Sequence, residues 1–93
     1  MSNIRFVWDP RKAESNRRKH GISFDEAQSV FYDEFAQLIH DPDHLEEERF
    51  ILLGMSNALR LLVVCHCYQE NDAVIRIISA RKATKKESKL YPG

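Results

Sequence analysis

The stretch EERFILLGMSNALRLLVVCHCYQENDAVIRIISARK, residues 47–82, decides the fold. It contains three runs rich in β-branched and aromatic residues, at 47–56, 57–68 and 73–82, joined by short turns. The segment QEND between the last two runs is a hairpin turn signal. The pattern predicts three consecutive strands that pair as antiparallel hairpins.

Two predicted helices precede these strands, and each has a recognisable start. DPRK at 9–12 places an aspartate at the N-cap and a proline at the first helical position. We expect this helix to run to about His20 and to stop at Gly21, since glycine suits the position after a helix. SFDE at 23–26 is a capping box, and the apolar spacing after it predicts a second helix over about 24–33.

The remaining elements complete an α+β chain. Strands are predicted at 4–8 and 34–44, the second ending in a polar turn. TKKE at 84–87 is another capping box, and the helix that follows should run towards Tyr91, where Pro92 forbids its extension. The predicted order is β-α-α-β-β-β-β-α, with helices beside a mostly antiparallel sheet.

Length and composition predict one small cytoplasmic domain over residues 1–93. The chain is 43% hydrophobic and 30% charged, which is typical of a globular protein. No apolar run approaches membrane-spanning length, and no signal-peptide pattern is present, so we expect no membrane contact. Cys65 and Cys67 lie two residues apart in an apolar strand, which favours reduced core thiols over a disulfide or a metal motif.

A formal net charge of zero conceals a strong segregation of charge along the chain. Residues 25–48 carry nine acidic residues and no lysine or arginine, whereas residues 76–89 carry six basic residues and one glutamate. Residues 9–20 add five basic residues against two acidic ones. Such asymmetry fits a protein that contacts nucleic acid with one face, although ordinary solvated faces would give the same counts.

Hairpin geometry suggests a row of polar side chains across the sheet. Residues directly opposite each other on neighbouring antiparallel strands share a face. If Tyr68 lies opposite Val74 across the QEND turn, then His66 lies opposite Arg76.

The preceding hairpin extends this row under a second assumed register. If Gly54 lies opposite Arg60, then Glu48 lies opposite His66, and Glu48, His66 and Arg76 cross three adjacent strands. The prediction depends on both registers, because a one-residue slip moves every side chain to the other face.

Such a row suits RNA cleavage without a metal. His66 and Glu48 could act as general acid and base, because histidine titrates near neutrality. Arg76 and Arg81 could hold the phosphate and stabilise its developing charge, since a guanidinium matches a phosphate bidentately. A hydrogen-bonded ladder of purely structural value is the alternative interpretation.

The segment RKATKKE at 81–87 predicts a corner that attracts anions. Arg81 and Lys82 end a strand just before the helix start at Thr84, where backbone N–H groups favour negative charge. A basic, solvated helix end is the alternative.

The segment HDPDH at 40–44 resembles a metal site only in composition. Asp-Pro-Asp is a common turn, and Pro42 prevents the helix on which two histidines at this spacing would face one way. We therefore expect neither a metal nor a cofactor.

Several strings together resemble the BrnT family of ribonuclease toxins from bacterial type II toxin–antitoxin pairs. They are FVWDPRKAESNRRKHGISFDEAQSVF at 6–31, DPDH with EERFILLG between 41 and 54, RLLVVCHCY at 60–68, and above all RIISARKATKKESKLY at 76–91. The resemblance covers about residues 6–91.

The resemblance implies a fold like that of RelE-type toxins and metal-independent endoribonuclease action that arrests translation and growth. It also implies a ribbon-helix-helix antitoxin (BrnA-like) as partner. The two would form a 2:2 heterotetramer that binds operator DNA through the antitoxin and represses its own operon.

Carried over residue by residue, the resemblance adds polar positions to the derived row. Its catalytic candidates are Glu48, His66, Arg76 and Arg81, and its RNA- or phosphate-binding candidates are Arg49, Arg60, Lys82, Lys19, His20 and Tyr91. The leading hypothesis is thus a ribonuclease toxin. The alternative is a non-catalytic module that binds the antitoxin and acts as its corepressor on DNA.

Overall fold

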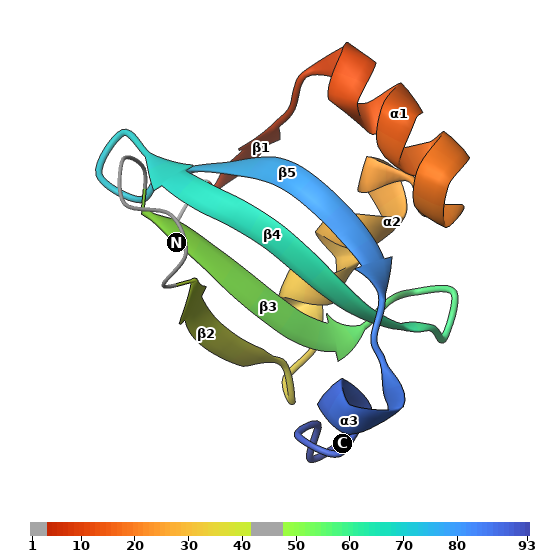
Figure 1. Cartoon of the computed structure of the whole chain (residues 1–93). Helices are drawn as coiled ribbons and strands as arrows, with labels where there is room; N and C mark the ends of the chain where they lie inside the picture. The colour runs from red at the N-terminus through yellow and green to blue at the C-terminus, as the bar shows by residue number, and fades with distance from the viewer. Residues whose placement is uncertain (1–3, 42–47) are drawn as a thin grey trace.

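The computed structural model describes residues 4–41 and 48–93, which form a five-stranded sheet with helices packed against it (Figure 1). The elements in chain order are β1 (Arg5–Val7), α1 (Pro10–His20), α2 (Phe24–Ser29), the 3₁₀ helix η1 (Val30–Tyr32), β2 (Gln37–Asp41), β3 (Arg49–Met55), β4 (Leu61–Gln69), β5 (Val74–Lys82) and α3 (Lys85–Ser88).

The sheet has the strand order β1-β5-β4-β3-β2. Strands β2 to β5 pair as antiparallel neighbours, whereas β1 runs parallel to β5. The α+β class and the mostly antiparallel sheet predicted from the sequence are therefore confirmed. The parallel pairing of β1 with β5 brings the first strand of the chain beside the last one, and α1 and α2 follow β1 directly in the chain.

The structure confirms the predicted starts of α1 and α2, and each start is held by a local hydrogen bond. The Asp9 side chain accepts from the Arg11 N–H, and the Ser23 side chain accepts from the Glu26 N–H. Gly21 ends α1 in the left-handed conformation, at φ 70°.

Two predicted helices are shorter in the structure. The segment predicted as one helix over 24–33 divides at Ser29 into α2 and η1, and α3 ends at Ser88 rather than near Tyr91. The strand predicted over 34–44 begins at Gln37, and its expected end at 42–44 lies outside the described residues. The ends of elements fray, so they are the part of an element that a local pattern defines least well.

The hydrophobic core lies between one face of the sheet and the helices α1, α2 and η1, which Figure 1 shows together on that side. We call this the helix face of the sheet and the opposite one the open face, because α1, α2 and η1 do not cover it; Leu53, Val63 and Cys67 on the open face are nonetheless buried. Core residues from the helix side are Ile22, Phe24, Ala27 and Val30; those from the sheet are Leu52, Leu62, Val64, Ile77 and Ala80.

A buried asparagine fastens α1 to the sheet. The Asn16 amide donates to the carbonyl oxygens of Ala80 and Ile22, and its oxygen accepts from the Ala80 N–H. Because an unpaired buried amide is costly, these three bonds fix the position of α1 along β5. No helix among the described residues is long and apolar enough to cross a membrane.

Candidate functional site

The register between β4 and β5 differs from the predicted one. Cys67, not His66, lies opposite Arg76, and His66 lies opposite Ile77. The expected pairing of Tyr68 with Val74 is wrong, because the strands meet one residue later, at Gln69 and Val74. As alternate residues face opposite sides of a sheet, Arg76 and His66 are on different faces.

The register between β3 and β4 is also different, but by two residues. Phe50 lies opposite His66, and Gly54 lies opposite Leu62 rather than Arg60. A two-residue slip preserves the face, so Glu48 stays on the side of His66 but lies farther along the sheet. The predicted row of Glu48, His66 and Arg76 therefore does not form, and Phe50, His66 and Ile77 occupy the corresponding line.

His66 is fully buried on the helix face and belongs to an aromatic cluster. Its ring meets that of Phe31 edge-on at 4.8 Å, and Phe50 and Tyr68 lie close beside it. Nδ1 donates to the Val64 carbonyl at 3.2 Å, which leaves Nε2 to accept from the Tyr68 hydroxyl at 3.1 Å. Burial lowers the pKa of His66, so the ring is held in its neutral form.

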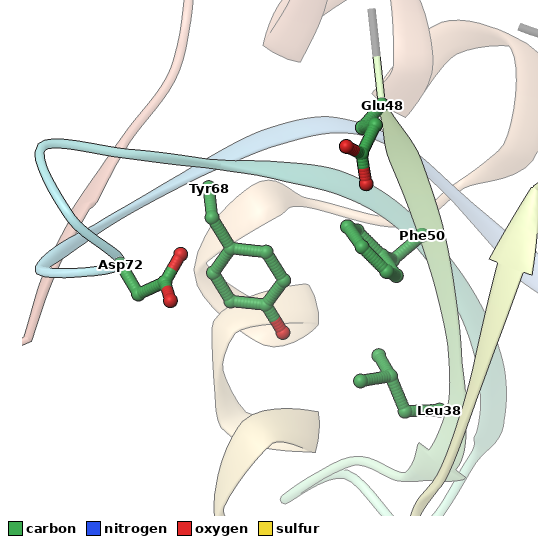
Figure 2. Close-up of a pocket in the computed structure, with 5 residues that line it drawn as sticks. All are labelled: Leu38, Glu48, Phe50, Tyr68 and Asp72. Carbon is green, nitrogen blue, oxygen red and sulfur yellow. The ribbon is translucent and has the colours of Figure 1, made fainter.

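Tyr68 connects this buried histidine to a surface hollow of about 490 Å³. Leu38, Glu48, Phe50, Tyr68 and Asp72 line it, and Figure 2 shows the tyrosine ring between the two carboxylate side chains. Burial, and secondarily the nearby Asp72 carboxylate, raises the pKa of Tyr68. Its hydroxyl therefore stays protonated and serves as a donor to His66.

Arginine side chains collect on the open face. Arg76 lies opposite Cys67, and Arg49 precedes Phe50, so both belong to the face away from His66. Leu62 and Val64 belong to the core on the helix face, so Val63 between them is on the open face. Arg81 lies opposite Val63 and is therefore on the open face as well. Arg81 lies near the opposite end of β5 from Arg76, and the sequence pattern could have placed the three arginines on one face only with the correct register.

Arg81 is already bound within the protein. It donates from both terminal nitrogens to Glu87, at 2.7 and 2.8 Å, and Glu87 in turn accepts from the Thr84 N–H. These contacts, with the Arg81 hydrogen bond as the largest cause, lower the pKa of Glu87 to about 2. The predicted capping box of Thr84 and Glu87 is present. The Glu87 carboxylate occupies the start of α3, where the sequence predicted that an external anion would be attracted.

Arg60 also has an internal partner. Its Nε donates to Glu26 at 2.9 Å, and the same carboxylate accepts from the Ser56 hydroxyl. The Arg60 hydrogen bond is the largest cause that lowers the pKa of Glu26, and Glu26 raises that of Arg60. This cluster joins α2 to the β3–β4 turn, so a structural role accounts for Arg60.

The other phosphate-binding candidates lie apart from one another. Tyr91 donates to Asp33 at 2.5 Å, a bond that raises the pKa of Tyr91 to about 12 and ties the C-terminal segment to the turn before β2. Lys19 and His20 are exposed at the end of α1, and Lys82 is exposed at the end of β5.

The HDPDH segment lies largely outside the described residues, since residues 42–47 are not described. Within the described part of the chain, no three potential ligands among histidine, cysteine, aspartate and glutamate are grouped to hold a metal.

Sequence reasoning missed Tyr68 and Asn16 as key polar residues. Nothing local marks Tyr68, because its role arises from contacts with His66 and the two hollows beside it. A polar residue on the face of α1 that meets the sheet could have marked Asn16.

Comparisons with known proteins point to one family. Residues 8–87 match the family described as "Ribonuclease toxin, BrnT, of type II toxin-antitoxin system". The structure is similar to the crystal structure of the Brucella abortus ribonuclease toxin BrnT, with a TM-score of 0.66, 23% sequence identity, and coverage of 88% of this chain and 99% of that one. No curated protein matches the chain.

Proposed function

Because the chain belongs to the BrnT family of ribonuclease toxins of type II toxin–antitoxin systems, we propose that it is a metal-independent endoribonuclease. It cleaves RNA, arrests translation and growth, and is neutralised by its antitoxin. The observation that carries the proposal is the pair of arginines on the open face, Arg49 from β3 and Arg76 from β5.

The open face suits an RNA backbone for electrostatic and geometric reasons. A guanidinium binds phosphate oxygens bidentately and keeps its charge at any physiological pH. Arg76 lies opposite Cys67, and Arg49 comes directly before Phe50, which lies opposite His66, so both side chains start from the same face near one end of the strands. A scissile phosphate between them would be contacted from two sides.

These arginines supply the electrostatic part of the reaction. The 2′-hydroxyl gives its proton to solvent water as its oxygen attacks the phosphorus, which produces a pentacoordinate species with additional negative charge. The bond from phosphorus to the 5′-oxygen then breaks, and the leaving oxygen takes a proton from water. Fixed guanidinium groups stabilise that charge in the way that a metal ion does in other nucleases, so the reaction requires no metal.

His66 is not part of this proposed RNA site. It is fully buried, neutral and on the opposite face from Arg76, so it cannot reach a phosphate bound there. Glu48 shares that opposite side, where it lines the hollow beside Tyr68. Glu48 and His66, the acid–base pair predicted from the sequence, therefore lie outside the proposed RNA site, and the arginines of the open face are the residues to test first.

The finer features of the system are also part of the proposal. The antitoxin is a ribbon-helix-helix protein, the complex is a 2:2 heterotetramer, and it represses its own operon through the antitoxin's contact with DNA. The mostly antiparallel sheet with helices on one face supports a relationship to RelE-type toxins.

The decisive variant is Arg76→Ala. It removes a partly exposed cation from the open face, so the fold should persist while growth arrest is lost. We expect RNA cleavage to fall by at least about tenfold, the effect of losing roughly 1.4 kcal/mol of transition-state stabilisation. The measurement is cleavage of total RNA in EDTA, together with growth after induction.

The matched control is Arg11→Ala, which removes an exposed arginine in the first turn of α1. It should cleave RNA and arrest growth as the parent protein does. Full toxicity of both Arg76→Ala and Arg49→Ala would refute the assignment of the open face. No RNA cleavage by the folded parent protein, with intact antitoxin binding, would favour the corepressor module instead.

A further inference from the structure

The helix face of the sheet has an uncovered end that forms a groove. The hollow beside Leu38, Glu48 and Asp72 shares one wall, Tyr68, with a second hollow of about 370 Å³. Ile4, Phe6, Phe31, Tyr32 and Ile75 line the second hollow with Tyr68. We call the two together the Tyr68 groove.

The walls of this groove are apolar and aromatic, and several are held by packing. Phe6 meets Phe31 edge-on at 5.2 Å, and Phe50 meets Tyr68 edge-on at 5.2 Å. The Tyr68 hydroxyl is fixed by its bond to His66. Because these wall side chains are already held by packing, they lose little conformational entropy when a ligand binds.

Exposed apolar side chains continue from the groove onto the surface. Tyr32 is 72% exposed, Leu38 is 53% exposed and Ile4 is 45% exposed, and all three line it. Apolar surface of this kind, next to a preformed hollow, is typical of a protein-binding site.

The charge at one end of the groove decides what kind of ligand fits. Glu48 and Asp72 place carboxylates on either side of the Tyr68 ring, as Figure 2 shows. Aromatic faces attract cations, and carboxylates do so more strongly, whereas both carboxylates repel a phosphate backbone. This chemistry favours a lysine or arginine side chain over RNA.

We propose that the Tyr68 groove receives a segment of the antitoxin in which a lysine or arginine is flanked by apolar side chains. The cation lies between Glu48, Asp72 and the Tyr68 ring, and the apolar neighbours fill the hollow beside Phe31 and Ile75. The inference rests on the proposed neutralisation by an antitoxin, and it adds the surface and the chemistry of contact.

This surface is distinct from the proposed RNA site. Tyr68 lies opposite Ile75 on the helix face, whereas Arg76 is on the open face. A change in the groove should therefore weaken the antitoxin complex without weakening RNA cleavage, which separates failure of this inference from failure of the proposed function.

Two exposed positions allow the test without disturbing the core. Leu38→Lys places a cation on the wall of the groove, and Asp72→Asn removes one of its carboxylates while keeping a residue that tolerates the left-handed φ of 67°. Leu59→Lys is the matched control, because Leu59 is an exposed leucine in the β3–β4 turn, at the other end of β4.

The experiment measures affinity for the purified cognate antitoxin, growth arrest with and without it, and cleavage of an oligoribonucleotide. We expect Leu38→Lys and Asp72→Asn to lose at least about tenfold in antitoxin affinity, to cleave RNA normally and to remain toxic when the antitoxin is co-expressed. Leu59→Lys should be neutralised like the parent protein.

Two results would overturn the inference. Unchanged antitoxin affinity in both groove variants would show that the segment docks elsewhere. Loss of oligoribonucleotide binding or cleavage in folded Leu38→Lys or Asp72→Asn would assign the groove to RNA instead. Absence of cleavage in the parent protein would count against the proposed function, while a loss of antitoxin affinity would still support the groove.

Discussion

His66 illustrates how burial changes the meaning of a residue type. A histidine next to basic strands suggests acid–base catalysis, because its ordinary pKa is near neutrality. Full burial among Phe31, Phe50 and Tyr68 instead keeps it neutral, and its two ring nitrogens bond within the protein. Its contribution is to position Tyr68.

The lowered pKa of His66 predicts a loss of stability in mild acid. The unfolded chain binds a proton at this histidine as the pH falls below about 6.5, whereas the folded protein resists it. The free energy of unfolding should therefore decrease as the pH falls from 6.5 towards the lower folded value. Urea denaturation of the parent protein and His66→Gln, at about pH 7.5 and about pH 5.5, measures this.

The variant should have a lower free energy of unfolding at the higher pH but a smaller further loss at the lower one. Equal losses in the two proteins would contradict a neutral, buried His66. Tyr68→Phe is a useful companion, since it removes the hydroxyl bonded to His66 but keeps the ring.

Gly54 is required for space rather than for a special backbone conformation. A Cβ atom at this position would lie 2.8 Å from Val30 Cγ1 and 3.0 Å from Ala36 Cβ. Gly54→Ala should destabilise the protein by roughly 1–3 kcal/mol, because η1 and the turn before β2 would have to move. Thermal or urea unfolding measures the change.

A double-mutant cycle with Val30→Ala tests this cause. Removing the valine methyl groups should relieve part of the clash, so the cost of Gly54→Ala should be smaller in that background. Strictly additive effects would show that the close approach to Val30 is not what excludes alanine.

At the scale of elements, the two hairpins show how turn conformation decides which residues meet. Residues 70–73 form the β4–β5 loop, and Glu70, Asn71 and Asp72 all have positive φ. In the β3–β4 loop, Leu59 alone has a positive φ, and Ser56 bonds to both Arg60 and Leu59. The β4–β5 loop, at 70–73, is one residue shorter than the assumed turn at 69–73. The β3–β4 loop, at 56–60, begins one residue later than the assumed turn at 55–59, so both registers shift.

The short helix α3 depends on one side-chain pair. Glu87 caps its N-terminus and binds Arg81 at the end of β5, so this carboxylate connects the helix to the sheet. The pKa of Glu87 is lowered to about 2, which means that its stabilising contribution is complete above about pH 4.5 and is lost as the pH falls towards 2.

Glu87→Gln should lower the free energy of unfolding at neutral pH by no more than about 1 kcal/mol, because the side chains of Arg81 and Glu87 are 41% and 31% exposed. The difference from the parent protein should shrink between about pH 4.5 and about pH 2. Glu34→Gln, at an exposed carboxylate before β2, is the control. A difference that stays constant with pH would contradict this role for Glu87.

At the scale of the whole molecule, the sheet separates two kinds of surface. Its helix face holds the core and, at one end, the apolar and acidic Tyr68 groove. Its open face carries Arg49, Arg76 and Arg81. Under the two proposals above, RNA and the antitoxin contact different faces, so substitutions are expected to weaken the two contacts independently.

Features that depend on neighbours along the chain could be predicted from the sequence alone. The caps at Asp9, Ser23 and Thr84, the stop at Gly21 and the strand-forming runs of 47–82 are local, and the structure contains them. The similarity to BrnT was also visible in ordered motifs, and the family match confirms it.

Which polar residues share a face depends on contacts between segments that are far apart in the chain. A slip of one residue between β4 and β5 turns Arg76 away from His66, and the packing of Phe31 closes His66 off from solvent. Strand periodicity is two, so a residue's face follows from its register, and register follows from turn conformation and core packing across the fold. These long-range contacts bury His66 on the helix face and place Arg49 and Arg76 on the open face, where the proposed RNA site lies.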